Sequence, residues 1–233
     1  MNGTEKTPYM IEAKNIQIAY GKKKVLTGVD LCADRGECIG LIGANGCGKS
    51  TLLKVFAGVL KPSSGHLQYY GHEAAGNAKL CRKMAGYVPQ DNPLMEELSV
   101  YDNLRLWYPN KKELEKELES GFLAVMGVSD YIKTRVSKLS GGMKKKVTLG
   151  IALSQTPPVL LMDEPGAALD LPARGEMRGY LEDYLDRKGT VLIASHEESE
   201  LDLCDRLYVM KKGRLHEVDP NMRGEDLIRE MSV

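Results

Sequence analysis

The sequence lacks the features of a membrane-embedded or secreted protein. None of its apolar stretches reaches the roughly 18 residues that a membrane-spanning helix needs, and residues 1–6 show no apolar core of a signal peptide. Its five cysteines follow neither the spacing of a zinc site nor that of a disulfide framework, which suits a reducing cytoplasm. We therefore expect a cytoplasmic chain without a membrane span of its own.

An excess of charge of one sign is also missing. Lys plus Arg and Asp plus Glu both total 32, so the net charge is zero and no nucleic-acid partner is indicated. The basic runs at residues 22–24 and 144–146 are interpreted as a hairpin tip and as the solvated face of a helix. With 42% apolar residues, the 233-residue chain suits one large α/β domain, or a core with an inserted subdomain.

One glycine-rich segment carries clear chemical information. Residues 43–50 read GANGCGKS and fit the pattern G-x-x-x-x-G-K-[ST], between a predicted buried strand at residues 38–42 and a predicted helix at residues 50–58. Glycines let backbone N–H groups turn toward an anion, and the start of a helix adds unpaired N–H groups and the positive end of its dipole. The segment predicts a loop that binds the phosphates of ATP or GTP, with Lys49 on the outer phosphates and Ser50 on Mg²⁺.

A second segment, VLLMDE at residues 159–164, ends in two carboxylates. The unbroken apolar run predicts a strand buried on both faces of a parallel sheet, and its carboxyl end lies where α/β sheets bind ligands. Because adjacent strand residues point to opposite sides, we expect Asp163 and Glu164 to differ in role. One would hold Mg²⁺, directly or through water, and the other would polarise the attacking water.

A third segment, LSGGM at residues 139–143, precedes a predicted helix over residues 144–155. Ser140 can cap this helix or bind a phosphate oxygen, and Gly141 and Gly142 expose N–H groups at its start. With this segment the chain resembles the ATP-binding subunits of ABC transporters, whose signature is LSGG-x. In that family the signature covers the γ-phosphate of ATP held by a second subunit.

The resemblance covers nearly the whole chain and implies further site residues. Tyr20 matches the aromatic residue that stacks on adenine, and Gln90 matches the glutamine that meets Mg²⁺ and water and joins the core to a helical subdomain. Asp170 matches the loop that crosses the dimer interface, and His196 matches the histidine that contacts the γ-phosphate. Without the resemblance, Tyr20 would be read as a strand-end tyrosine and His196 as a surface residue.

The expected site residues fall into four groups by role. The catalytic residues are Glu164, His196, Gln90 and Lys49. The nucleotide-binding residues are Tyr20, Gly43, Ala44, Asn45, Gly46, Cys47, Gly48, Lys49, Ser50 and Thr51. The residues that contact ATP in a second subunit are Ser140, Gly141, Gly142, Met143 and Asp170. The metal-binding residues are Ser50, Gln90 and Asp163.

Two positions depart from the family pattern. Met143 stands where glutamine is usual, and Ala168 stands where serine is usual. Both are expected beside the dimer interface. The departures therefore concern how that interface closes.

Cys47 lies beside Lys49 at the start of a predicted helix. It is a candidate reactive thiol, or alternatively a small residue that fills space in a tight loop.

The fold class that the resemblance implies is α/β: a phosphate-loop NTPase core with a mixed sheet, a parallel core plus an antiparallel part, and an inserted helical subdomain. Residues 1–90 and 156–233 would form the core, and residues 91–155 the helical subdomain, of a single ABC ATPase domain. Ser99 is expected to cap a helix that runs to Tyr108. A helix over residues 111–126 would bury one face, which carries Leu114, Leu118, Phe122 and Val125.

Two classes of function fit. In the first, the chain and a second copy or a homologous subunit close on two ATP molecules with Mg²⁺, and a separate permease holds them at the inner face of the cell membrane. The compact helical region, the short C-terminal end and the segment SHEESEL before CDR resemble bacterial exporter ATPases. In the second, it is a non-transport ABC ATPase, such as one that serves iron–sulfur cluster assembly. Chromosome-type and translation-type members are disfavoured, since no coiled-coil insert or second phosphate loop is found.

Overall fold

The computed structural model describes residues 8–232. Residues 1–6, which were expected to hold no signal peptide, lie outside this part of the chain. Among the described residues, no helix is both long enough and apolar enough to cross a membrane.

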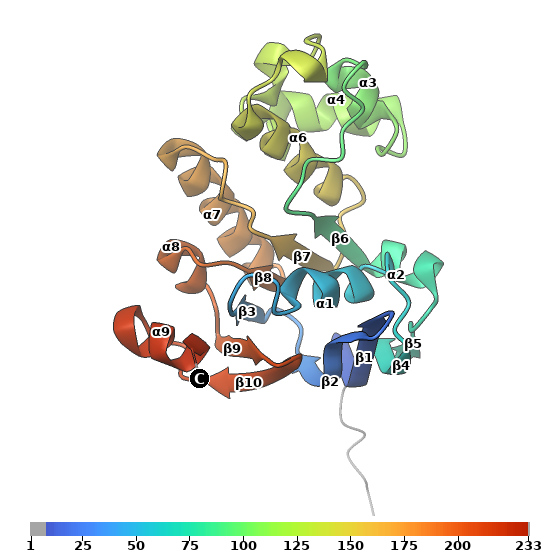
Figure 1. The fold of residues 1–233 in the computed structure, drawn as a ribbon. Helices are drawn as coiled ribbons and strands as arrows, with labels where there is room; N and C mark the ends of the chain where they lie inside the picture. Colours follow the sequence, from blue (N-terminus) through green and yellow to red (C-terminus); the bar gives the residue numbers. More distant parts are fainter. Residues whose placement is uncertain (1–7, 233) are drawn as a thin grey trace, which may run out of the picture.

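A six-stranded sheet with the order β10-β9-β3-β8-β7-β6 lies at the centre of the fold (Figure 1). Its strands are β3 (Cys38–Ile42), β6 (Ala85–Val88), β7 (Val159–Asp163), β8 (Thr190–Ala194), β9 (Arg206–Lys211) and β10 (Arg214–Val218). Neighbouring strands are parallel, except that β10 returns antiparallel to β9. Every residue of β3, β7 and β8 is buried, which explains why each appears in the sequence as an unbroken apolar run.

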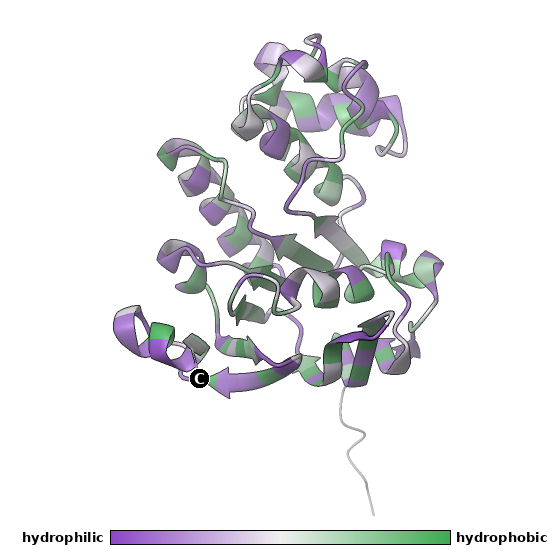
Figure 2. Cartoon of the chain, viewed as in Figure 1, coloured by the Kyte–Doolittle hydropathy of each residue, from purple (hydrophilic) through white to green (hydrophobic). Residues whose placement is uncertain are grey.

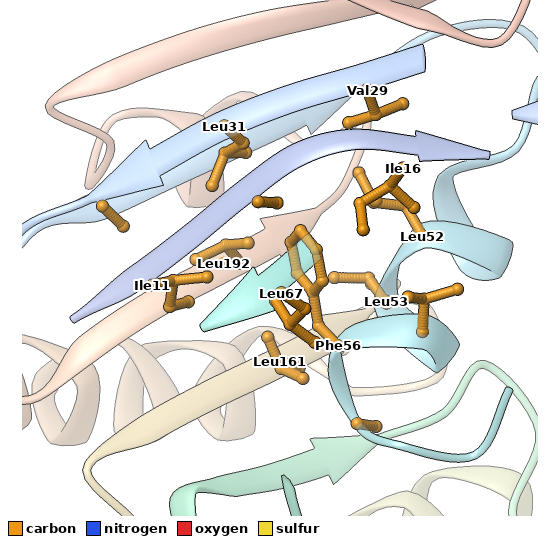
Figure 3. Close-up of a cluster of buried hydrophobic side chains, with 14 of the residues drawn as sticks. Ile11, Ile16, Val29, Leu31, Leu52, Leu53, Phe56, Leu67, Leu161 and Leu192 are labelled. Carbon is orange, nitrogen blue, oxygen red and sulfur yellow. The ribbon is translucent and has the colours of Figure 1, made fainter. Parts of the chain in front are cut away.

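A second, antiparallel sheet has the order β2-β1-β4-β5. Its strands are β1 (Ile11–Tyr20), β2 (Lys23–Ala33), β4 (Ser64–Tyr69) and β5 (His72–Glu73). Helix α1 (Lys49–Phe56) is packed between this sheet and the central one, with Leu52, Leu53 and Phe56 in the shared core (Figure 3). The combination of a mostly parallel and an antiparallel sheet confirms the expected fold class.

The helical part of the chain lies between β6 and β7 in sequence and at one end of the molecule in space (Figure 1). It contains α3 (Val100–Arg105), α4 (Lys111–Ser120), α5 (Phe122–Val125), two short 3-10 helices (Val128–Tyr131 and Val136–Lys138) and α6 (Gly141–Leu153). Ser99 caps α3 as expected, because its hydroxyl accepts a hydrogen bond from the N–H of Asp102 at 3.1 Å. The helix ends at Arg105, short of Tyr108.

The helix expected over residues 111–126 is broken at Gly121, which is extended at φ −96° and ψ −164°. The break changes the phase of the helical face. Leu114 and Phe122 are buried, whereas Leu118 is half-buried and Val125 is 54% exposed. Val125 was therefore wrongly placed in the core, where Leu123 and Met126 are found instead.

The remaining helices are α2 (Ala78–Met84), α7 (Leu171–Asp186), α8 (Glu198–Leu201) and α9 (Gly224–Ser232). Figure 2 shows that β10 and α9, at the edge of the central sheet, are largely hydrophilic, whereas the inner strands are hydrophobic. This pattern follows from position, since an edge strand and its covering helix meet water on one side.

Candidate nucleotide-binding site

The loop between β3 and α1 has the geometry of an anion cradle. Gly43 has φ +147°, and a Cβ on it would lie 2.7 Å from the carbonyl oxygen of Met210. Gly48, at φ +123°, precedes the first residue of α1. Only glycine adopts such backbone angles freely. The loop therefore turns its backbone toward the start of α1, where unpaired N–H groups favour an anion.

Lys49 is the first residue of α1 and is buried. Its Nζ donates a hydrogen bond to the carbonyl oxygen of Gly43 at 2.6 Å, so the ammonium is held across its own loop. The same Nζ lies 3.4 Å from Nε2 of His196. Nε2 of His196 in turn lies 3.6 Å from Oε1 of Glu164. Three of the expected catalytic residues thus lie in one row.

The two carboxylates at the end of β7 do not alternate as expected. The strand ends at Asp163, which is buried, and Glu164 has left-handed backbone angles at φ +50°. Its N–H donates to the carbonyl oxygen of Ala194 at 2.9 Å. Because the chain turns at Glu164, the rule that successive strand residues point to opposite sides no longer applies there. Both carboxylates consequently face one pocket.

This pocket has a volume of about 210 Å³ and brings together three separate segments. Its lining residues are Asn45, Gly46, Gly48, Lys49, Ser50, Thr51, Gln90, Asp163 and Glu164. The phosphate loop, the expected switch glutamine and both carboxylates therefore share one cavity, although they lie far apart in the sequence.

Four of the expected nucleotide-binding residues are not among those that line the pocket: Tyr20, Gly43, Ala44 and Cys47. Tyr20 ends β1 and is 53% exposed. Cys47 is half-buried and packs against the core cluster, and its Sγ lies 2.9 Å from where a Cβ on Gly43 would be. Its thiol therefore lies on the core side of the loop, as expected of a small filler.

The signature segment begins α6. The Ser140 hydroxyl accepts a hydrogen bond from the N–H of Met143 at 3.2 Å and so caps the helix. A Cβ on Gly142 would lie 2.7 Å from the carbonyl oxygen of Ala168, so a glycine is needed for this close packing. Asp170 caps α7 by accepting from the N–H of Ala173 at 3.0 Å. Among the described residues that line the pocket, none belongs to the signature or is Asp170.

The structure reveals connections around the pocket that the sequence did not suggest. Arg174 donates to the carbonyl oxygen of Leu169 at 3.1 Å and to the carboxylate of Glu197 at 2.8 Å, which ties the loop after β7 to the loop that carries His196. Glu200 is 5% exposed. Burial raises the pKa of its carboxyl group, and the carboxylates of Glu197 and Glu164 act in the same direction.

Lys145 was wrongly assigned to a solvated helix face. It is 1% exposed, and its Nζ donates to the carbonyl oxygens of Pro89 at 2.9 Å and Gln90 at 3.0 Å. No signal in the sequence singles out Lys145, because residues 148–150, each one turn after one of the three lysines, are all buried. Because residues 144–146 are all lysines, the run was interpreted as exposed throughout.

The comparisons with known proteins agree with this architecture. The chain matches the ABC transporter family over residues 26–167. It is 37% identical over 210 residues to the Nod factor export ATP-binding protein I of Rhizobium etli, covering 88% of this chain and 66% of that protein. It is 31% identical over 210 residues to the linearmycin resistance ATP-binding protein LnrL of Bacillus subtilis, and this match covers 88% of this chain and 68% of that protein. The chain spans about two thirds of the length of these relatives.

A solved structure of an ATP-binding subunit of an ABC transporter has the same fold. It is 28% identical in sequence, and the structural alignment has a TM-score of 0.80 and covers 95% of this chain and 92% of that one. The family match extends over more than half of the chain and contains the phosphate loop, the signature and both carboxylates. The chain therefore belongs to the ABC transporter family, of which it carries the ATP-binding and ATP-hydrolysing domain.

Proposed function

We propose that this chain is the subunit that powers a membrane transporter by ATP-driven dimer closure, and that the transporter exports its substrate. The observation that carries the proposal is the pocket itself, in which the phosphate loop, Gln90 and two carboxylates meet while the signature stays outside. The direction of transport is supported by two relatives, one named for export of Nod factor and the other for resistance to linearmycin.

In the pocket and beside it, each residue has a role that its chemistry supports. Lys49 and the N–H groups of residues 45–51 would bind the phosphates, and Tyr20 would stack on adenine from outside the pocket. Glu164 would accept the proton of the attacking water. His196, within reach of both Lys49 and Glu164, would contact the γ-phosphate and hold the two charged groups apart.

Ser50, Gln90 and Asp163 fit a magnesium site. A hydroxyl, an amide and one carboxylate all line the pocket, and Mg²⁺ prefers such oxygen donors together with water and phosphate. When bound, Mg²⁺ would neutralise charge on the phosphates. With Asp163 in this role, Glu164 is left to activate water.

The signature residues Ser140, Gly141, Gly142 and Met143, with Asp170, would meet the ATP held by a second copy or by a homologous subunit. Their place outside this chain's own pocket supports that arrangement. A separate permease would hold the dimer at the cytoplasmic face of the membrane. In this proposal residues 1–233 are one domain, with a core of residues 1–90 and 156–233 and a helical subdomain over about residues 91–155.

Two experiments test the proposal. The purified chain should hydrolyse ATP with a requirement for Mg²⁺. In addition, the tagged chain should co-purify with a multi-span membrane protein from detergent-extracted membranes. Co-purification with a soluble scaffold instead would favour the alternative, an ATPase of iron–sulfur cluster assembly. Absence of Mg²⁺-dependent hydrolysis would contradict both.

A further inference from the structure

Lys145 joins the signature helix to the loop that carries Gln90. It lies in α6 one turn after Gly141, and its side chain is almost completely buried. Its Nζ donates to the carbonyl oxygens of two consecutive residues, Pro89 at 2.9 Å and Gln90 at 3.0 Å, which lie 56 and 55 residues away in sequence. An ammonium group is a donor only, and two backbone acceptors fix its direction.

The neighbours of Lys145 in the basic run behave differently. The side chain of Lys144 is 21% exposed and forms an ion pair with Glu96 at 2.6 Å. Lys146 is only half-buried. Of the three lysines, Lys145 is therefore the one that is buried, and its burial disfavours the charged form of its ammonium group. Burial lowers the pKa of the Lys145 ammonium, while the carboxylates of Asp163, Asp91, Glu164 and Glu200 favour its charged form.

A second contact joins the same two segments one turn further along α6. The hydroxyl of Thr148, which is buried, lies 3.1 Å from Oδ1 of Asn92 and 3.0 Å from the carbonyl oxygen of Lys144, so the two acceptors share its one proton. The segment 89–92 is thus held by α6 at two consecutive turns. Gln90 also lines the pocket, whereas Ser140 and Gly142 stand at the start of the same helix. A rigid helix consequently connects the rim of this chain's pocket to the surface that would meet the other subunit's ATP.

We infer that Lys145 is a positioning residue that keeps the signature in register with Gln90. If Gln90 moves when ATP enters the pocket, α6 would then move with it, and Ser140 and Gly142 would move together with the helix. The inference rests on the proposed function, because it assumes that the signature of one chain closes on the ATP of another. It predicts that the ammonium of Lys145 matters for closure more than for ATP binding by the single chain.

The test uses Glu164→Gln chains, in which slow hydrolysis should let closed dimers accumulate. Lys145→Met keeps an unbranched side chain that is one atom shorter and removes its donors, and Lys144→Met is the matched control in the adjacent position. Two quantities are measured: the affinity of the dilute single chain for a fluorescent ATP analogue, and the ATP concentration that gives half-maximal dimer by gel filtration.

We expect the affinity of the single chain to change by less than about twofold in either variant. The ATP concentration for dimer formation should rise about 5- to 30-fold in Lys145→Met, within the range of measured couplings between sites. It should stay within about twofold in Lys144→Met. Lys145→Arg, which keeps the donors, should recover part of the loss. Closure of Lys145→Met at the concentration of the control would overturn the inference.

Thermal unfolding of each variant separates this role from a purely structural one. A structural role would lower the midpoint and weaken ATP binding and closure together, and that outcome would also overturn the inference. If Lys145→Met does not fold, Lys145→Gln keeps an amide donor and is measured in the same way, with the same two decisive outcomes. Failure of the Glu164→Gln parent to bind ATP would instead refute the proposed function.

Discussion

The ammonium group of Lys49 lies 3.4 Å from Nε2 of His196, although 147 residues separate them in sequence. The sheet explains the contact. Strands β3 and β8 are parallel neighbours, and the segments after their carboxyl ends carry Lys49 and His196. Groups that follow adjacent parallel strands meet at one edge of the sheet, which is where α/β folds place their ligand sites.

Lys49→Ala should abolish ATP hydrolysis and weaken nucleotide binding. Lys49 is the only full positive charge among the described residues that line the pocket, and charge-assisted bonds to phosphate are strong. Steady-state ATPase assays and equilibrium binding provide the measurements. Lys54→Ala, on the same helix outside the pocket lining, is the matched control and should retain activity. A turnover rate in Lys49→Ala equal to that of the parent would refute the assignment.

Glu164→Gln should bind ATP but hydrolyse it about 10²- to 10⁴-fold more slowly, the usual cost of losing a general base. Glutamine has nearly the same shape, so the left-handed turn at φ +50° and the N–H bond to Ala194 should remain. Single-turnover kinetics and gel filtration with ATP measure hydrolysis and closure. The prediction is wrong if hydrolysis keeps the parent rate or if ATP no longer binds.

Ser140→Arg should block closure by steric clash while leaving ATP binding by the single chain intact. The substitution also removes the cap of α6, a loss of about 0.5–2 kcal/mol in stability. Ser140→Ala removes the cap without adding bulk and therefore separates the two effects. Dimer formation with ATP is measured in the Glu164→Gln chain. Normal closure of Ser140→Arg would place the signature away from the interface.

Met143→Gln should change the ATPase rate by only a fewfold. The Met143 side chain is partly buried against a core cluster that spans the helical part and the central sheet, and its N–H donates a hydrogen bond to the capping hydroxyl of Ser140. Atoms of Ser140 and the adjacent glycines are therefore expected to make most of the phosphate contact. The measurement is the ATPase rate at saturating ATP. A change of several orders of magnitude would mean that this side chain reaches the reacting groups.

Glu200→Gln should stabilise the fold at pH 8 and have little effect at pH 5. The pKa of Glu200 is raised in the folded state because burial disfavours its charge more than hydrogen bonds from Ser195 and from the backbone of Gly166 favour it. Above the ordinary carboxyl pKa, the Glu200 carboxyl group ionises more readily in the unfolded chain than in the folded one. Stability is therefore lost as the pH rises through the folded pKa, and glutamine removes that loss.

Thermal unfolding of both proteins across this pH range provides the measurement. Each 1 kcal/mol of stabilisation should raise the midpoint by about 2–4 °C in a domain of this size. Glu182→Gln, an exposed carboxylate on α7, is the control and should show no such trend. A benefit of Glu200→Gln that is as large at pH 5 as at pH 8 would contradict the assigned burial effect.

Local chemistry was readable from the sequence. Buried parallel strands such as β7 and β8 appear as apolar runs, because both of their faces are covered. Gly43 and Gly48 mark backbone angles that other residues adopt poorly, and Ser99 and Ser140 mark helix starts that need an acceptor. Each of these signals depends on a few neighbouring residues, so the phosphate loop and the strand that ends in two carboxylates could be predicted, whereas Gln90 and the mixed sheet with its helical insert were predicted from the resemblance.

Only the tertiary structure decided which side chains face which partners. Lys145 is buried because a loop 55 residues earlier supplies two carbonyl oxygens, and nothing in the run of three lysines distinguishes it by composition. Glu164 faces the pocket because the chain turns at the end of β7, and Val125 faces water because Gly121 resets the helix phase. A residue pattern specifies the element, but the direction of a side chain also depends on where the backbone breaks, as at Gly121 and Glu164, and on distant segments that supply a partner, as at Lys145.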